Sequence, residues 1–555
     1  MPFWVLNEYE RIQNGAEARR LIMVESEQDV ALEDTDRIHG RAALVNNVKA
    51  ASSLAGAVRS TLGPKGLDKM LVEADGSALV TNDGVTVLET AQVEHPTARL
   101  LIDASSSQDR AARDGTTTTV LLISEMLHNA LELVRMGIHP SVVVNGYGIA
   151  LEEALEEVER VAREADETQR MQVVRTTLEG KADSGLCDLF AGLAIQAADA
   201  LSEEDGEGDL ERLRVKRLQV RQGNVMDSGL VQGLMLPKSR VDISTPANSG
   251  GGVVAIVDGG LDHPKLEISA KIEVDSLGVM QGFHDRALEN LQRQVDHLAS
   301  LGVDLLVVRD GIADEAVSLL AKAGITAYRR FERTDLELLS MMTGAKLSRD
   351  ALHINKGDVG DYAGRSEEAI ADVKHTIIDG TCGGAMTLVV RGSSPAVREE
   401  AMRIFDDAIG VAHRLTSKPE ILPGGGAIQT HLARHLRAFA PSQAGREQLA
   451  IEAYAAALEI VPRALADNGG FDSVDVILAL SADQSESGAW IGFDLGKGKN
   501  GDMSEAGILD PLFLVRHALS GATEAAISVL RIDDVLWAKT EIGTPDWEEE
   551  EDSGG

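Results

Sequence analysis

The spacing of apolar residues changes twice along the chain. From Arg41 to Leu62, apolar side chains recur every three or four residues, which predicts an amphipathic helix. Gly63-Pro64 ends this helix, because proline disfavours helical geometry in the residue before it. Alanine, leucine and glutamate are then abundant through most of residues 85–165, which predicts further helices.

Two short apolar runs, at residues 70–72 and 78–81, interrupt this helical region. They are joined around Asp75-Gly76, and a pair of runs on either side of such a turn predicts a β-hairpin. Asn82-Asp83-Gly84 comes directly after the second run and leads the chain into the next helix.

The middle of the chain alternates between short apolar runs and helical patterns. Strands are predicted at 253–257, 303–308 and 325–328, with helices near 286–301 and 313–323 between them. Such alternation is typical of βαβ units with parallel strands. Alanine-rich helices return after about Arg398. We therefore predict an α/β multidomain protein in which a middle domain is inserted into a discontinuous, mostly helical one.

Composition narrows the possible partners. The 555 residues include 89 acidic and 53 basic side chains, so the net charge is −36. A field of this sign repels phosphate backbones, and we expect no nucleic-acid binding. An excess of carboxylates also fits a protein kept soluble in concentrated salt. We interpret the chain as halophilic, with an ordinary acidic protein as the alternative.

The two ends of the chain and its two cysteines do not indicate a catalytic or metal-binding site. No run of 18 or more apolar residues and no signal peptide is visible, so we predict a cytoplasmic protein without a membrane span. Residues 1–23 do not match the rest of the chain, and Met23 is a more natural start, so they are interpreted as an extra arm or a misassigned start. Cys187 and Cys382 have no metal-ligand or disulfide-framework spacing.

The run DGTTTT, from Asp114 to Thr119, is the strongest candidate for chemistry. Its glycine allows close approach, its hydroxyls and helix amides can donate to phosphate oxygens, and its carboxylate is a hard ligand for Mg²⁺. The alternative is a helix capped by Asp114 with solvated threonines. The chain has no P-loop and no clear dinucleotide-binding glycine motif. Three more glycine-containing turns lie at residues 61–66, 81–84 and 423–427.

Taken in order, these motifs resemble those of group II chaperonin subunits of the archaeal thermosome type. The likeness covers about residues 30–540. It is carried by STLGPKGLDKMLV (60–72), TNDGVTVL (81–88), DGTTT (114–118), ILPGGGA (421–427), GILDP (507–511) and ATEAAISVLRIDD (522–534). The resemblance implies a mostly helical equatorial domain, an intermediate hinge domain and an inserted α/β apical domain.

The resemblance also sets domain boundaries. They are 1–23 for an extra arm, 24–165 and 421–540 for the equatorial domain, 166–236 and 385–420 for the intermediate domain, 237–384 for the apical domain with a lid-like protrusion near 275–284, and 541–555 for an acidic tail.

Individual residues receive roles from the same resemblance. Asp114 matches the Mg²⁺ ligand, and Asp83 and Asp407 match two carboxylates that position the attacking water, with Asp406 as a close alternative to Asp407. Asp494 is matched to the ribose, and Arg113 replaces a glycine that the family usually has. The nucleotide-binding matches are Leu62, Gly63, Pro64, Gly84, Gly115, Thr116, Thr117, Thr118, Gly180, Lys181, Gly425 and Asp494.

These matches imply an ATPase that uses ATP and Mg²⁺ to fold proteins. Hydrolysis would drive domain closure around unfolded client polypeptides, in a double ring built from copies of this chain or from paralogous subunits. The alternative is a divergent nucleotide-binding subunit with a structural or regulatory role in a mixed ring. No small-substrate signature supports an unrelated acidic enzyme such as a kinase.

Overall fold

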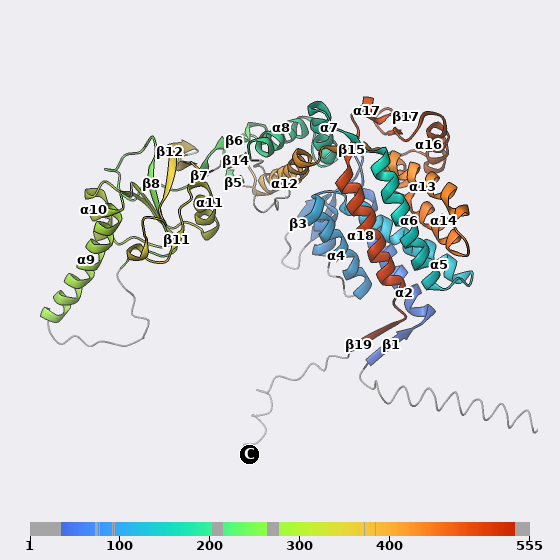
Figure 1. The fold of residues 1–555 in the computed structure, drawn as a ribbon, viewed down its shortest axis with the longest axis horizontal. Helices are drawn as coiled ribbons and strands as arrows, with labels where there is room; N and C mark the ends of the chain where they lie inside the picture. Colours follow the sequence, from blue (N-terminus) through green and yellow to red (C-terminus); the bar gives the residue numbers. More distant parts are fainter. Residues whose placement is uncertain are drawn as a thin grey trace, which may run out of the picture.

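The computed structural model describes residues 35–538, apart from 73–75, 77, 92, 94, 202–214, 263–276, 371 and 383. In Figure 1 the molecule is elongated, with a mostly helical part at one end, an α/β part at the other, and a smaller connecting part between them. The predicted arm at 1–23, the acidic tail at 541–555 and the start of the predicted protrusion lie outside the described residues.

The helical part is a bundle around a central helix. Its main helices are α2 (Arg41–Val58), α3 (Gly84–Thr90), α4 (Pro96–Ala112), α5 (Thr116–Arg135), α6 (Pro140–Val161), α13 (Ala427–Phe439), α14 (Glu447–Leu458), α15 (Ile460–Asn468), α16 (Ser473–Ser487) and α18 (Leu512–Leu530). Four consecutive residues of α5, 120–123, are all buried, as expected for a helix surrounded by α2, α4, α14 and α18. One hydrophobic core unites apolar residues from 44–158 and 422–530.

Short strand pairs border this bundle. β2 (Lys69–Val72) and β3 (Ala78–Thr81) pair antiparallel, which confirms the predicted hairpin. β1 (Thr35–His39) pairs with β19 (Asp534–Ala538) from the other end of the described chain. The remaining short strands are β4 (Arg163–Glu164), β15 (Glu420–Pro423), β18 (Leu509–Pro511), β16 (Ile491–Asp494) and β17 (Lys499–Asp502).

The α/β part contains a seven-stranded sheet. Its strands run in the order β10 (Thr326–Tyr328), β9 (Leu305–Val308), β8 (Gly252–Val257), β12 (Gly360–Ile370), β13 (Val373–Gly380) and β7 (Leu234–Leu236), with β11 (Leu347–Ser348) beside β8. β8, β9 and β10 are parallel, which confirms the predicted βαβ units. Their helices are α9 (Leu277–Ser300) and α10 (Asp314–Lys322), followed by α11 (Arg333–Thr343). α9 begins earlier than predicted, and the side chains of 277–284 lie outside the description.

The connecting part is crossed twice by the chain. Helices α7 (Glu167–Leu178), α8 (Ser184–Leu201) and α12 (Pro395–Ser417) pack on one another beside a three-stranded sheet of β5 (Val215–Val220), β14 (Met386–Arg391) and β6 (Gly229–Gln232). A second hydrophobic core lies among them. Lys216 on β5 forms an ion pair with the buried Asp335 on α11, which ties this part to the α/β part.

α8 contains no uninterrupted run of 18 apolar residues, but its average composition is apolar. Among the described residues it is the one helix long and apolar enough, by length and composition, to cross a membrane. In the structure, the buried Phe190 and Cys187 belong to the core shared with α7 and α12. This packing favours the interpretation of α8 as a core helix.

Candidate functional site

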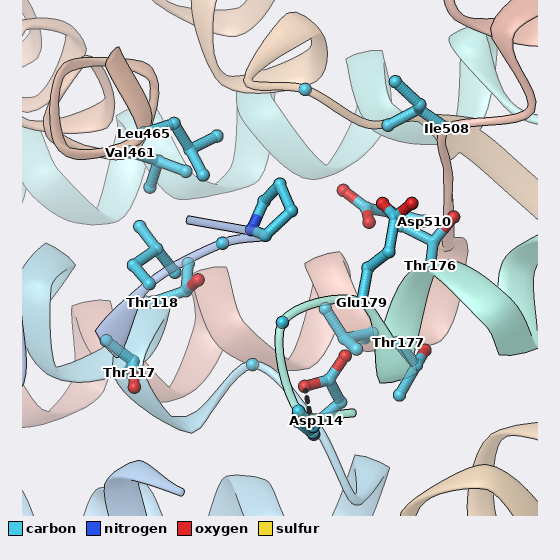
Figure 2. Close-up of a pocket in the computed structure, with 18 of the residues that line it drawn as sticks. Asp114, Thr117, Thr118, Thr176, Thr177, Glu179, Val461, Leu465, Ile508 and Asp510 are labelled. Atoms are coloured by element: carbon cyan, nitrogen blue, oxygen red, sulfur yellow. Dashed lines mark hydrogen bonds and ion pairs between the residues drawn. The ribbon is translucent and has the colours of Figure 1, made fainter. Parts of the chain in front are cut away.

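A cavity of about 650 Å³ lies where the helical part meets the connecting part. All four glycine-containing turns that the sequence analysis selected reach it, together with Asp83 and Asp114. The lining includes every residue predicted to bind nucleotide, namely Leu62, Gly63, Pro64, Gly84, Gly115, Thr116, Thr117, Thr118, Gly180, Lys181, Gly425 and Asp494. In Figure 2 the apolar Val461 and Leu465 lie across the cavity from the carboxylates of Asp114 and Asp510.

The N-terminus of α5 forms one wall of this cavity. Gly115 caps the helix with φ +78°, a left-handed conformation that suits glycine, and the helix begins at Thr116. The first amides of a helix have no partner within it and carry a partial positive charge, so this wall is suited to an anion. Thr119 does not face a ligand. Its hydroxyl donates to the Gly115 carbonyl at 3.1 Å, so the last threonine of the DGTTTT run has a structural role in the helix.

Two loops from distant parts of the sequence are stacked beside this wall. Gly180 has φ +90°, and a Cβ added there would lie 2.7 Å from the Gly63 carbonyl oxygen. Asn82 donates its side-chain amide to the Gly180 carbonyl at 2.6 Å. The backbone contacts therefore require glycine at position 180 and hold Lys181 at a defined place.

Lys181 joins two predicted site carboxylates. Its Nζ lies 3.3 Å from Asp114 Oδ1 and 2.8 Å from Asp407 Oδ2 on α12. Burial lowers the pKa of Lys181, but the carboxylates of Asp114 and Asp407 outweigh it and raise the pKa above its ordinary value. Burial raises the pKa of Asp407 to about 7, against the opposing effect of Lys181. Asp406 instead pairs with Arg217 on β5 at 2.5 Å, so the two neighbouring carboxylates face different partners.

Asp83 and Gly84 approach α5 from α3. Asp83 caps α3, because its carboxylate accepts hydrogen bonds from the Thr86 amide at 3.0 Å and the Thr86 hydroxyl at 2.6 Å. A Cβ at Gly84 would lie 2.6 Å from the Thr117 hydroxyl oxygen, so only glycine allows α3 this close to the first turn of α5. Asp83 also lies near enough to Asp407 to add to the rise in the pKa of that carboxyl.

Arg113 occupies an unusual backbone position. It ends α4 with φ +56° and ψ 15°, a left-handed conformation that costs a residue with a Cβ roughly 1 kcal/mol relative to glycine. This explains physically why glycine suits the position. Its guanidinium lies 3.4 Å from Asp109, whose pKa is raised by burial and lowered by Arg113, with a net increase.

Two further carboxylates line the cavity in different environments. Asp494 accepts hydrogen bonds from the Lys497 amide at 3.0 Å and from its ammonium at 2.8 Å. Burial opposes this, but the net result is a lowered pKa for Asp494. Asp510 on β18 was not among the predicted site residues. Burial, with a smaller effect of Asp114, raises its pKa to about 7, and its place in the GILDP motif was the signal that could have found it.

The donor set limits how a metal could bind. No group of three or more His, Cys, Asp or Glu side chains within the described residues is arranged to hold a metal ion. Mg²⁺ that accompanies a nucleotide is usually held by one or two carboxylates, water and phosphate oxygens. Asp114, which directly precedes the N-terminal turn of α5, fits that second kind of site and not an all-protein one.

A cavity that combines helix amides, hydroxyls and close glycine turns with a lysine and carboxylates defines a nucleotide-binding protein. The model of the TCP-1/cpn60 chaperonin family matches residues 54–540. The chain is 37% identical over 514 residues to thermosome subunit alpha of Thermoplasma acidophilum, covering 92% of this chain and 94% of the relative. It is 37% identical over 513 residues to thermosome subunit beta of Archaeoglobus fulgidus, covering 91% and 94%.

The chain therefore belongs to the TCP-1/cpn60 chaperonin family. Members of this family are ATPases that assist protein folding, so the chain is a subunit of an ATP-dependent chaperonin. The resemblance drawn from its motifs is confirmed.

Proposed function

We propose that this cavity is the ATPase site, with Asp114 as the Mg²⁺ ligand and with Asp83 and Asp407 positioning the attacking water. The observation that carries the proposal is the contact of Lys181 with both Asp114 and Asp407, at 3.3 and 2.8 Å. Through it, Asp407 of the connecting part, which is not itself a lining residue of the cavity, is joined to Asp114 of the helical part, which is. Asp407 is favoured over Asp406 because Asp406 pairs with Arg217.

The residues of the cavity suit phosphoryl transfer, which depends on positioning and charge neutralisation more than on covalent chemistry. Bound Mg²⁺ would offset negative charge on the phosphate oxygens. The α5 amides and the hydroxyls of Thr116, Thr117 and Thr118 donate to those oxygens, while Gly63 and Gly425 let the backbone approach. Val461 and Leu465 offer an apolar surface to the base, and Asp494 and Asp510 are candidates to accept hydrogen bonds from the ribose.

The domain boundaries are part of the same proposal. One hydrophobic core lies within the proposed equatorial segments and one within the apical segment. Another lies mostly within the intermediate segments but includes Ile421, Trp490 and Leu509, and a fourth joins apical residues to Leu234, Leu236 and Ala385. Asp83 and Asp114 then belong to the equatorial domain and Asp407 to the intermediate domain. Because the site needs both, relative movement of the domains would assemble or open it, which couples hydrolysis to closure.

The test compares two neighbouring carboxylates. We expect Asp407→Ala to lower kcat for ATP hydrolysis by about a hundredfold or more while ATP affinity changes little, since its role is in positioning water. Asp406→Ala is the matched control and should keep nearly full turnover, because it loses only a half-exposed ion pair with Arg217. Retained hydrolysis in Asp407→Ala together with its loss in Asp406→Ala would move the role to Asp406.

The partners and surroundings are proposed from the family. We infer a cytoplasmic double ring of this chain with itself or with paralogous subunits, acting on unfolded polypeptides through its apical domain. The names of the relatives distinguish alpha and beta subunits, which supports mixed rings. Steady ATP hydrolysis by the purified homo-oligomer would favour the folding machine over a divergent subunit with a structural or regulatory role.

A further inference from the structure

Arg113 has a long side chain at a position whose backbone conformation favours glycine. The residue comes directly after α4 with φ +56°, and its amide closes the helix by donating to the Asp109 carbonyl at 2.8 Å. Glycine would satisfy the same backbone hydrogen bond without the conformational cost. Strained residues of this kind persist mainly at functional sites, where the side chain has a use. Arg113 also directly precedes Asp114, the proposed metal ligand.

The guanidinium of Arg113 is held only loosely. It pairs with Asp109, with Nη1 3.4 Å from Oδ2, and the two side chains are 34% and 26% exposed. A strong charge-assisted hydrogen bond between such groups is shorter, about 2.7–2.9 Å. The side chain lines the cavity, so it can turn from Asp109 to an anion inside it without breaking a strong pair.

The other cations of the cavity are differently placed. Its charged lining residues are the acids Asp83, Asp109, Asp114, Glu179, Asp494 and Asp510 and the bases Lys65, Arg113, Arg175 and Lys181. Lys181 already lies between two carboxylates, Arg175 pairs with Asp188 at 3.2 Å, and Lys65 is exposed. Arg113 is therefore the lining cation that adjoins the N-terminus of α5, and its ion pair, with Asp109 at 3.4 Å, is the longest of those that the lining cations make.

We propose that Arg113 is a further phosphate-contacting residue of the ATPase and that it binds the terminal phosphate of ATP. Asp109, which holds the guanidinium, lies close enough to Asp83 and Lys181 to interact with both electrostatically. Arg113 thus acts at the end of the cavity where water is positioned. A planar guanidinium can donate two parallel hydrogen bonds to a phosphate, whereas glycine has no side chain that could donate them. This inference rests on the proposed ATPase site.

The test measures ATP and ADP binding to the intact oligomer. Arg113→Gly and Arg113→Asn remove the charge, and both residues tolerate the left-handed backbone, so the fold is kept. We expect both variants to raise the Kd for ATP about tenfold, or 1.4 kcal/mol, with the Kd for ADP nearly unchanged. Arg113→Lys should recover part of the loss. In the same nucleotide-free samples, Arg113→Gly should melt higher than the parent protein.

Three outcomes distinguish a failure of this inference from a failure of the proposed ATPase site. If the parent protein hydrolyses ATP and Asp407→Ala does not, but Arg113→Gly keeps the parent affinity for ATP, Arg113 is only a helix terminus and the inference is wrong. Equal loss of ATP and ADP affinity would overturn the assignment to the terminal phosphate. If the parent protein binds neither nucleotide, the proposed ATPase site itself fails.

Discussion

The contact between the Gly180 loop and the Gly63 loop allows a sharp test of the site, through Gly180→Ala. The new Cβ would lie 2.7 Å from the Gly63 carbonyl oxygen, closer than real Cβ contacts come. Neither side can yield freely. The Gly63 carbonyl accepts a hydrogen bond from the Gly66 amide at 2.9 Å, and the Gly180 carbonyl is held by Asn82 at 2.6 Å.

Gly137 provides a matched control that isolates the clash. It has φ +89°, almost the same as the φ +90° of Gly180, but a Cβ there would meet nothing within 4 Å. Gly137→Ala should therefore lower the free energy of unfolding by only about 1–2 kcal/mol, which is the cost of placing a Cβ in the left-handed conformation. Gly180→Ala should lower the free energy of unfolding by about 1–3 kcal/mol more than Gly137→Ala does, because the backbone must shift to relieve the clash.

The backbone shift at position 180 should also affect ATP hydrolysis, because Lys181 is the next residue after Gly180. A displacement of the loop would separate the Lys181 ammonium from Asp114 and Asp407. We expect ATP turnover to fall at least about tenfold in Gly180→Ala and to stay near the parent value in Gly137→Ala. Denaturant midpoints and steady-state ATP hydrolysis measure the two effects. Equal values for the two variants in both assays would refute the reasoning.

Two further predictions concern the solvent. The pKa values of Asp407 and Asp510 are raised from 3.8 to about 7 in the folded protein, so their protonated forms favour folding. That contribution is complete below the unfolded pKa and is lost as pH rises from the unfolded pKa through the folded one, so the melting temperature of the nucleotide-free protein should fall between about pH 4 and 7. Asp510→Asn should flatten part of the fall, and a flat parent profile would contradict the shifts. The net charge of −36 predicts a higher melting temperature in molar KCl than in low salt, and an unchanged one would count against salt adaptation.

The sequence by itself determined the elements and much of the site. The helix from Arg41, the hairpin before Asn82 and the parallel strands of the middle region were all predictable, because periodic burial and glycine or proline turns act over a few neighbouring residues. The glycine-containing turns of the candidate site were predictable for the same reason. Their motifs also identified the family, and the predicted nucleotide-binding residues do share one cavity.

Tertiary structure decided the rest, because side chains from distant segments meet only after the domains pack. Adjacent residues on a helix point in different directions, so the packing of α12 was needed to direct Asp407 to Lys181 and Asp406 to Arg217. Asp510 stood in a motif of the sequence, but only the fold shows that it lines the cavity and that burial, with a smaller effect of Asp114, raises its pKa. The left-handed backbone of Arg113 depends on how α4 turns into α5, and the arginine itself gives no sign of it, although the glycine that the family usually has there is consistent with it.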